Sequence, residues 1–274
     1  MDTLAYRNGK FIPKSQLTVE YSDLGFERGF AVFEYCRERG GRIPFLEDHL
    51  HRLLHSMSLL RFEEPASDSD IRAVVEKLQA KNNLSDSYFK ILISGTMEGR
   101  RIVPAVTIYQ DIFQPYPESF FKQGIALILQ EYEKPFPEYK TTFYLGSLKE
   151  WQRLLDASAE DVLFYANNTI RECSRCNIFI VKNGLIYTPE KNLLKGVTRK
   201  HVIRCAMQTQ MVIEKDISVR ELFNADEIFI TSTTRNITPV VRIEDQAIAN
   251  GAPGPVTIDL SRLFNQYCER YGIQ

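Results

Sequence analysis

The sequence lacks long apolar runs, paired cysteines and an excess of one charge, and each absence excludes a class of protein. No apolar stretch approaches the roughly 18 residues that a membrane-spanning helix needs, and the N-terminal ten residues have no apolar signal-peptide core. The five cysteines are odd in number and scattered, which is typical of a reducing cytosol rather than of a disulfide scaffold. We therefore expect a cytoplasmic protein with no membrane partner.

The charge of the chain is nearly balanced. Its 34 basic and 35 acidic residues give a net charge of −1, so nothing indicates a nucleic-acid partner. With 274 residues, of which 44% are hydrophobic, the chain can build one large domain or two modest ones with ample core. It contains no repeats or low-complexity tracts, so individual motifs must indicate the function.

The apolar periodicity predicts two α+β domains, over residues 1–117 and 118–274. The boundary is the segment 114–118, where two prolines can neither pair in a sheet nor continue a helix. Before it, we predict helices over 47–62 and 68–81, the second with Ser67 as its cap, strands over 88–94 and 105–109, and a loop over 95–104. After it, we predict strands over 124–130, 162–166 and 227–231, helices over 145–159, 198–209 and 255–271, and a hairpin over 178–188. Clefts between domains are common ligand sites.

The most informative residue is Glu172, which stands directly after a short apolar strand and before a polar turn. That position suits a carboxylate that contacts a ligand's ring nitrogen. Lys140 lies 32 residues upstream, and burial beside Pro135–Tyr139 would lower its pKa and leave more neutral amine. A lysine that forms an imine and a carboxylate that keeps a pyridinium charged are the groups that pyridoxal phosphate (PLP) chemistry most needs. One lysine among fourteen is, however, ordinarily a solvated surface residue.

Three further segments offer groups for a phosphate. Gly196 is followed by Val197 and Thr198, which open a predicted helix whose free N–H groups suit an anion. Thr231–Thr234 places four hydroxyl residues at the end of a predicted strand. Arg52 could direct a guanidinium at the same phosphate. Taken singly, the first segment is better explained by an ordinary helix capped by Thr198, the second equally well by a solvated turn, and Arg52 better by a helix-surface arginine.

The pair Cys173-x-x-Cys176 has the spacing of half a zinc site or of a redox pair. No second pair completes a zinc site, and no histidine follows at finger spacing. We therefore expect no metal, and we interpret both cysteines as small residues packed near a ligand.

Together these segments resemble the fold-type IV, or class IV, PLP enzymes, which include branched-chain and D-amino acid aminotransferases and aminodeoxychorismate lyase. The resemblance covers nearly the whole chain, and the matching segments fall in family order: Lys140, Asn167–Glu172, Asn177–Phe179, Leu194–Arg199, Thr231–Thr234, Ile237–Val240 and Gly254–Thr257. It implies a small N-terminal α/β domain and a larger C-terminal PLP-binding domain with a barrel-like sheet. It also implies an active site in the interdomain cleft and a homodimer, in which the loop over 95–104 reaches toward the other subunit.

The resemblance assigns roles to particular residues. Lys140 would be catalytic, forming the Schiff base and moving the proton, and Glu172 would pair with the pyridinium nitrogen. Leu194 would pack on the ring, and the phosphate would be held by Arg52, Val197, Thr198, Ser232 and Thr233. The substrate would contact Phe33, Arg100 and Thr234.

Two departures from the family pattern concern the substrate rather than the cofactor. Phe30-Ala31 replaces part of the family's Gly-Asp-Gly turn, and Cys173 stands where a glycine often follows the glutamate. The favoured function is transfer of an amino group between an amino acid, of branched-chain or D-type, and a 2-oxo acid. The alternatives are a lyase that releases pyruvate and 4-aminobenzoate from aminodeoxychorismate and a non-catalytic PLP-binding homologue.

Overall fold

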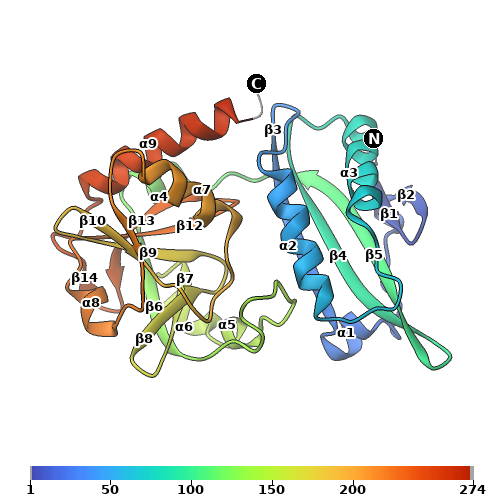
Figure 1. Cartoon of the computed structure of the whole chain (residues 1–274), viewed down its shortest axis with the longest axis horizontal. Helices are drawn as coiled ribbons and strands as arrows, with labels where there is room; N and C mark the ends of the chain where they lie inside the picture. Colours follow the sequence, from blue (N-terminus) through green and yellow to red (C-terminus); the bar gives the residue numbers. More distant parts are fainter. Residues whose placement is uncertain (1, 272–274) are drawn as a thin grey trace. The chain divides into compact units, whose positions relative to one another are not determined.

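The computed structural model describes residues 2–271 and divides into two compact units (Figure 1). Unit 1 contains the residues up to Gln114 together with Tyr139–Phe143, and unit 2 contains Pro115–Glu138 and the residues from Tyr144 onward. The division lies close to the boundary expected at residue 117, but it places Lys140 in unit 1. The short segment around Lys140 belongs there because its backbone pairs with the strand that begins at Ala31.

Unit 1 is built on a five-stranded antiparallel sheet in the order β2-β1-β5-β4-β3 (Figure 1). The strands are β1 (Leu4–Arg7), β2 (Lys10–Pro13), β3 (Ala31–Arg39), β4 (Asp86–Glu98) and β5 (Arg101–Ile112). The helices are the short α1 (Leu24–Arg28), α2 (Leu46–Ser58) and α3 (Asp68–Asn82). The Ser67 hydroxyl accepts a hydrogen bond from Asp70 N at 3.1 Å, so the cap expected for α3 is present.

Helices α2 and α3 pack on one face of this sheet. Alternate residues of β4, namely Phe89, Ile91 and Ile93, are fully buried in one apolar cluster with residues of both helices. This alternation is expected of a strand that has one face on a core. The same layer fixes the position of α2, which carries Arg52.

The predicted loop over residues 95–104 is wrong. These residues continue β4 to Glu98 and begin β5 at Arg101, so they form a long hairpin that turns at Gly99 (φ +63°) and Arg100. Gly95 lies inside the strand β4, and the residue is a glycine because a Cβ there would approach Ile102 to 2.7 Å and Phe30 to 2.9 Å. A glycine within a strand often marks a close approach of this kind rather than a loop.

Unit 2 contains a nine-stranded mixed sheet in the order β11-β10-β9-β12-β13-β6-β7-β8, with β14 paired to β13. Its strands are β6 (Ile125–Glu131), β7 (Asp161–Ala166), β8 (Thr169–Cys173), β9 (Asn177–Lys182), β10 (Leu185–Thr188), β11 (Val212–Glu214), β12 (Glu227–Ser232), β13 (Asn236–Ile243) and β14 (Gln246–Ala247). Strand β8 continues into β9 through a three-residue turn, although β12, β13, β6 and β7 lie between them in the sheet. The sheet therefore curls upon itself, as the barrel-like prediction requires.

The two faces of the curled sheet are filled differently. An apolar cluster that includes Ile178, Ile230 and Leu163 fills the inner face. Phe179 and Phe229 point to the opposite face and stack with ring centroids 4.8 Å apart. Helices α7 (Val197–Ala206) and α9 (Pro255–Arg270) pack over the strands of this second face (Figure 1). The first turn of α7 is thereby fixed against the sheet.

The remaining helices of unit 2 are α4 (Glu118–Lys122), α5 (Leu145–Leu148), α6 (Trp151–Asp156) and α8 (Val219–Phe223). The prediction of one helix over 145–159 is therefore wrong: two short helices are interrupted at Lys149 and Glu150, and the second ends at Asp156. The predicted hairpin over 178–188 is confirmed, with positive φ at both turn residues, Asn183 (50°) and Gly184 (76°).

Candidate active site

Lys140 is held at its backbone by unit 1. Its N–H donates to Ser56 Oγ at 3.0 Å, and its carbonyl accepts from Phe33 N at 2.9 Å. The Lys140 ammonium lies 4.6 Å from the centroid of the Phe33 ring. Two predicted site residues, Lys140 and Phe33, are thus brought together by β3 and α2, and the half-buried amine has an aromatic face beside it.

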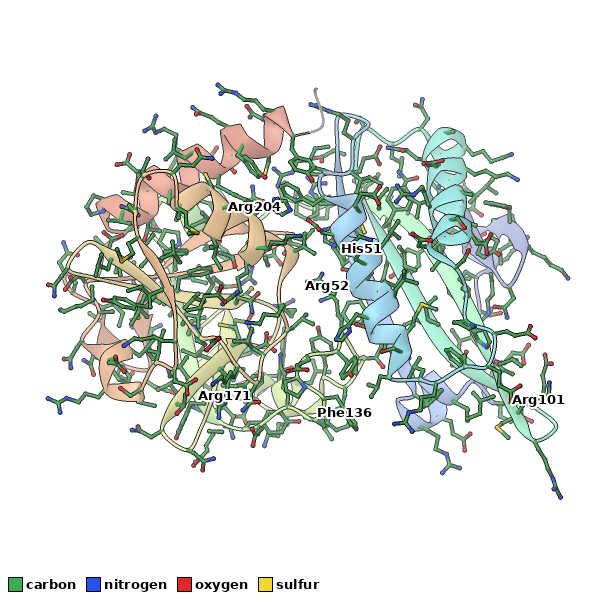
Figure 2. The ribbon with its side chains drawn as sticks, in the orientation of Figure 1. His51, Arg52, Arg101, Phe136, Arg171 and Arg204 are labelled. Carbon is green, nitrogen blue, oxygen red and sulfur yellow. The ribbon has the colours of Figure 1, made fainter. Side chains whose placement is uncertain are left out.

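Arg52 is bound on both sides of its fork by Glu34, a residue for which we predicted no role. Arg52 Nε lies 2.9 Å from Glu34 Oε2, and Nη2 lies 2.7 Å from Oε1. His49 Nδ1 lies 3.1 Å from Oε1, and Tyr35 N donates to the same oxygen at 2.8 Å. Figure 2 shows Arg52 on α2. Glu34 could have been singled out in the sequence, because it stands among apolar residues of a strand and a buried charge requires a partner.

The charges of this cluster follow from burial and pairing. Burial alone would raise the pKa of the fully buried Glu34, but Arg52 and His49 outweigh it and hold that pKa well below its usual range. Burial lowers the pKa of His49, and the charge of Glu34 only partly opposes this effect. At neutral pH Glu34 is therefore an anion and His49 is neutral. The two hydrogen bonds from Arg52 to this anion fix the guanidinium in one orientation.

Glu172 lies on β8 in unit 2, and only 4% of it is exposed. Its Oε1 accepts from Lys134 Nζ at 2.9 Å, and its Oε2 accepts from Leu194 N at 3.2 Å and Asn177 Nδ2 at 3.4 Å. The structure thus brings the predicted pair Glu172 and Leu194 together. Burial first, and then the charge of Glu172, raise the pKa of the Tyr144 phenol above its usual range, so Tyr144 also belongs to this site.

The start of α7 is tied to Glu172 through Asn177. Asn177 Nδ2 donates to the Leu194 carbonyl at 2.8 Å, and a Cβ at Gly196 would approach Asn177 Oδ1 to 2.1 Å. A side chain at this position would displace the Asn177 amide, which glycine leaves in place. The helix begins at Val197 with no side-chain cap, so the capped-helix interpretation with Thr198 as cap is wrong. The buried Val197 and Thr198 instead form an uncapped first turn, which suits an anion.

The hydroxyl residues after β12 form a compact turn. Ser232 Oγ lies 3.2 Å from Thr234 Oγ1 and accepts from Arg235 N at 3.2 Å. Within residues 2–271, the buried Thr231 Oγ1 and Arg235 Nη1 have no hydrogen-bond partner. Ser232, Thr233 and Thr234 are half-buried, so they form a polar cluster rather than a fully solvated turn.

Arg100 is exposed in the β4–β5 turn, and Figure 2 shows its neighbour Arg101 at the end of this hairpin, apart from Arg52. The substrate role of Arg100 stays a prediction.

Cys173 and Cys176 are buried, free and packed in the inner core of unit 2. Burial raises the pKa of both thiols, that of Cys176 to about 11, so neither is a thiolate at neutral pH.

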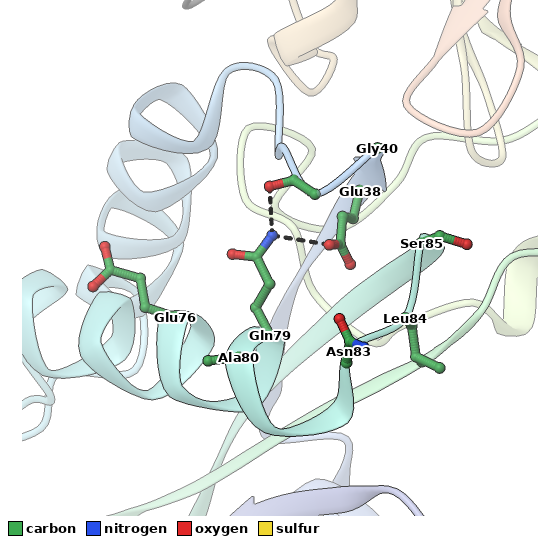
Figure 3. A pocket seen from close by; sticks show the side chains of 9 residues that line it. Glu38, Gly40, Glu76, Gln79, Ala80, Asn83, Leu84 and Ser85 are labelled. Atoms are coloured by element: carbon green, nitrogen blue, oxygen red, sulfur yellow. Dashed lines mark hydrogen bonds between the residues drawn. The ribbon is translucent and has the colours of Figure 1, made fainter.

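A separate hollow of about 560 Å³ in unit 1 contains none of the predicted site residues (Figure 3). The Gln79 amide donates there to Glu38 at 2.9 Å and to the Gly41 carbonyl at 3.0 Å (Figure 3).

Among the described residues, no helix is long and apolar enough to cross a membrane. In the same part of the chain, no three His, Cys, Asp or Glu side chains are grouped to hold a metal ion.

The fold is a mixed α/β fold with a curled sheet, and comparison with known proteins identifies the class of the protein. Residues 31–243 match the family described as amino-transferase class IV. The chain is 31% identical to a putative branched-chain-amino-acid aminotransferase of Methanocaldococcus jannaschii, over 98% of each chain. It is 28% identical to a D-alanine aminotransferase of Listeria monocytogenes serotype 4b, over 94% of this chain and 93% of the other. The chain therefore belongs to the class IV aminotransferase family.

Solved structures confirm the fold. The branched-chain aminotransferase of the archaeon Thermoproteus uzoniensis with norvaline has a TM-score of 0.89 at 23% identity, covering 99% of this chain and 96% of that one. The branched-chain enzyme of Escherichia coli has a TM-score of 0.85 at 24% identity, covering 96% and 92%. The relatives give the lyase alternative no support over the aminotransferase.

Proposed function

We propose that the protein uses PLP to transfer an amino group between an amino acid and a 2-oxo acid. The observation that carries the cofactor assignment is the Glu172 carboxylate, which is buried and fixed by three donors, one of them the backbone of Leu194. A buried carboxylate held ionised is the partner that a pyridinium nitrogen needs. The uncapped turn at Val197 and Thr198 lies only a few residues further along and supplies donors for a phosphate.

We assign a role to each predicted cofactor residue. When bound, PLP would supply an electron sink for the charge that develops at the substrate Cα. Glu172 would hold the ring nitrogen protonated, and Leu194 would contact the ring. The phosphate would be held by the backbone N–H groups of Val197 and Thr198 and by side chains of Arg52, Thr198, Ser232 and Thr233. Glu34 would keep Arg52 oriented.

Lys140 would supply the amine that binds the cofactor and would then move the proton at the substrate Cα. Its backbone contacts with Ser56 and Phe33 fix the base of the side chain, from which the amine extends beside the Phe33 ring. Phe33, Thr234 and Arg100 would contact the substrate. Because relatives are named D-alanine and branched-chain aminotransferases, we propose a donor of one of these two types.

A panel of L- and D-amino acids tests the proposed function. We expect purified protein to bind PLP, and D-alanine or an L-branched-chain amino acid to convert the bound aldehyde to the amine form, with release of the matching 2-oxo acid. The conversion is monitored as a loss of the visible absorbance of the bound aldehyde. If no amino acid in the panel causes this loss, the proposal of transamination fails.

We also propose that two copies of the chain associate through α5 and α6. Leu145, Leu148, Trp151 and Leu155 recur at helical spacing and are 66%, 62%, 61% and 56% exposed. An exposed apolar stripe on a monomer marks an interaction site, and a two-fold dimer would cover both copies at once.

Light scattering tests this association. We expect the wild-type protein to have twice the 31.7 kDa mass of one chain, and the double variant Leu148→Glu, Trp151→Glu to have the mass of one. Ile258→Glu, at a 53% exposed position on α9, is the matched control and should leave the mass unchanged. A monomeric wild-type protein, or a double variant that stays dimeric, contradicts the assignment.

A further inference from the structure

Lys134 contacts Glu172 from a distant part of the sequence. It lies in the segment that follows β6, 38 residues before Glu172. Its ammonium donates to Glu172 Oε1 at 2.9 Å and to the carbonyls of Cys173 and Ser174, both at 3.2 Å. An ammonium has three N–H donors, and these three acceptors use all of them. Lys134 is therefore anchored to the β8–β9 turn in one place, rather than moving as a surface lysine does.

The two oxygens of Glu172 are held from different sides. Lys134 bonds to Oε1, while the Leu194 N–H and the Asn177 amide bond to Oε2. The Lys134 side chain is 24% exposed and that of Glu172 only 6%, so the pair is screened little by solvent. A charge-assisted bond in these surroundings fixes the rotation of the carboxylate and favours its charged form.

We propose that Lys134 is a positioning residue, which keeps Glu172 ionised and oriented as the partner of the cofactor's ring nitrogen. The inference rests on the proposed function, in which Glu172 receives that nitrogen. Lys134 itself has no contact with reacting atoms in this account, and it acts through Glu172.

Three neighbours of Glu172 in the described part of the chain do not supply this charge between pH 6 and 8. Tyr144, Cys173 and Cys176 are neutral in that range, because burial raises the pKa of each. Arg175 lies 4.0 Å from the fully buried Asp161, so these two charges largely offset each other. The ammonium of Lys134 is bonded to Glu172 directly, so its removal takes a positive charge away from the carboxylate.

The sign of the pH effect follows from this arrangement. Without the ammonium, burial favours the neutral acid and the pKa of Glu172 rises. As the pH falls through that raised pKa, Glu172 takes up a proton and stops pairing with a protonated ring nitrogen. A variant without the ammonium should therefore lose affinity for PLP relative to wild type as the pH falls, and should recover it as the pH rises.

Equilibrium titration of the cofactor-free protein with PLP at pH 6 and pH 8 tests the proposal. We expect Lys134→Met to bind about tenfold more weakly than wild type at pH 6, as one unit of pKa implies, and to bind nearly as well at pH 8. Lys134→Arg keeps the charge and should follow wild type at both pH values. The matched control is Lys182→Met, because Lys182 pairs with the exposed Asp226 in the same unit. This control should also follow wild type.

Two outcomes of this titration overturn the inference: equal affinity of Lys134→Met and wild type at pH 6, or a loss that is the same at both pH values. A wild-type protein that binds no PLP refutes the proposed function instead.

Thermal unfolding without cofactor then tests whether Lys134 acts through the charge of Glu172. Lys134→Met should lower the melting temperature at pH 8 when residue 172 is Glu and should have little effect in the Glu172→Gln background. Equal effects in both backgrounds contradict the inference.

Discussion

Replacing Lys140 by alanine should abolish amino transfer. The rate of the half-reaction with the best amino donor should fall by about 10²–10⁴-fold from the loss of the proton-transfer group alone. Ser56 and Phe33 fix the backbone of Lys140. Another lysine would have to reach the same position from a different part of the backbone, so we expect none to replace it. Single-turnover kinetics of the PLP-loaded protein measure this rate.

Lys149→Ala is the matched control for this result. Lys149 is the next lysine along the chain, is 51% exposed and pairs with Glu150 at 3.8 Å. Its replacement should leave the half-reaction within about twofold of wild type, since exposed pairs of this kind contribute little. If Lys149→Ala loses the reaction and Lys140→Ala keeps it, the assignment of the lysine is wrong.

Replacing Glu34 by alanine should have the largest effect on stability. Glu34 is fully buried, and its removal leaves the Arg52 guanidinium, 11% exposed, without its bidentate partner. Loss of one partner of a buried pair costs about 3–5 kcal/mol, and the free energy of unfolding from denaturant titration should fall by that amount at pH 7. The control Glu47→Ala removes a 64% exposed carboxylate that lies on the same helix as Arg52 and pairs with Arg72, and should cost less than about 1 kcal/mol.

The pH dependence of this effect has a definite sign. The pKa of Glu34 is lower in the folded protein than its ordinary value of 4.5. Its contribution to stability is therefore complete above pH 4.5 and is lost as the pH falls from there toward the folded-state pKa. The difference in stability between wild type and Glu34→Ala should shrink between about pH 4.5 and pH 3. A difference that is unchanged over this range contradicts the assignment of Glu34 as a buried anion.

Local patterns in the sequence predicted the local structure well. Ser67 caps α3 and Asn183-Gly184 closes a hairpin, because a cap or a two-residue turn depends on a few adjacent residues. The loop expected over 95–104 failed for the opposite reason. Gly95 is required by the side chains of Phe30 and Ile102, and a contact with Phe30, far along the chain, leaves no mark in the local pattern.

The candidate site shows the same limit. Glu172, Leu194 and the first turn of α7 were indicated by their order along the chain, and the structure brings Glu172 and Leu194 into contact. The partners that set their charge were not indicated. Lys134 is a lysine without a distinctive motif, and it reaches Glu172 because β6, β7 and β8 lie next to one another in the sheet. Glu34 likewise acquires its role from α2, through His49 and Arg52.

The most direct test of the central claim is to find which lysine carries the cofactor. The wild-type protein is loaded with PLP and reduced with borohydride, and its peptides are then analysed by mass spectrometry. We predict that the phosphopyridoxyl mass lies on Lys140, out of fourteen lysines. Attachment to any other lysine, or to none, would contradict the account.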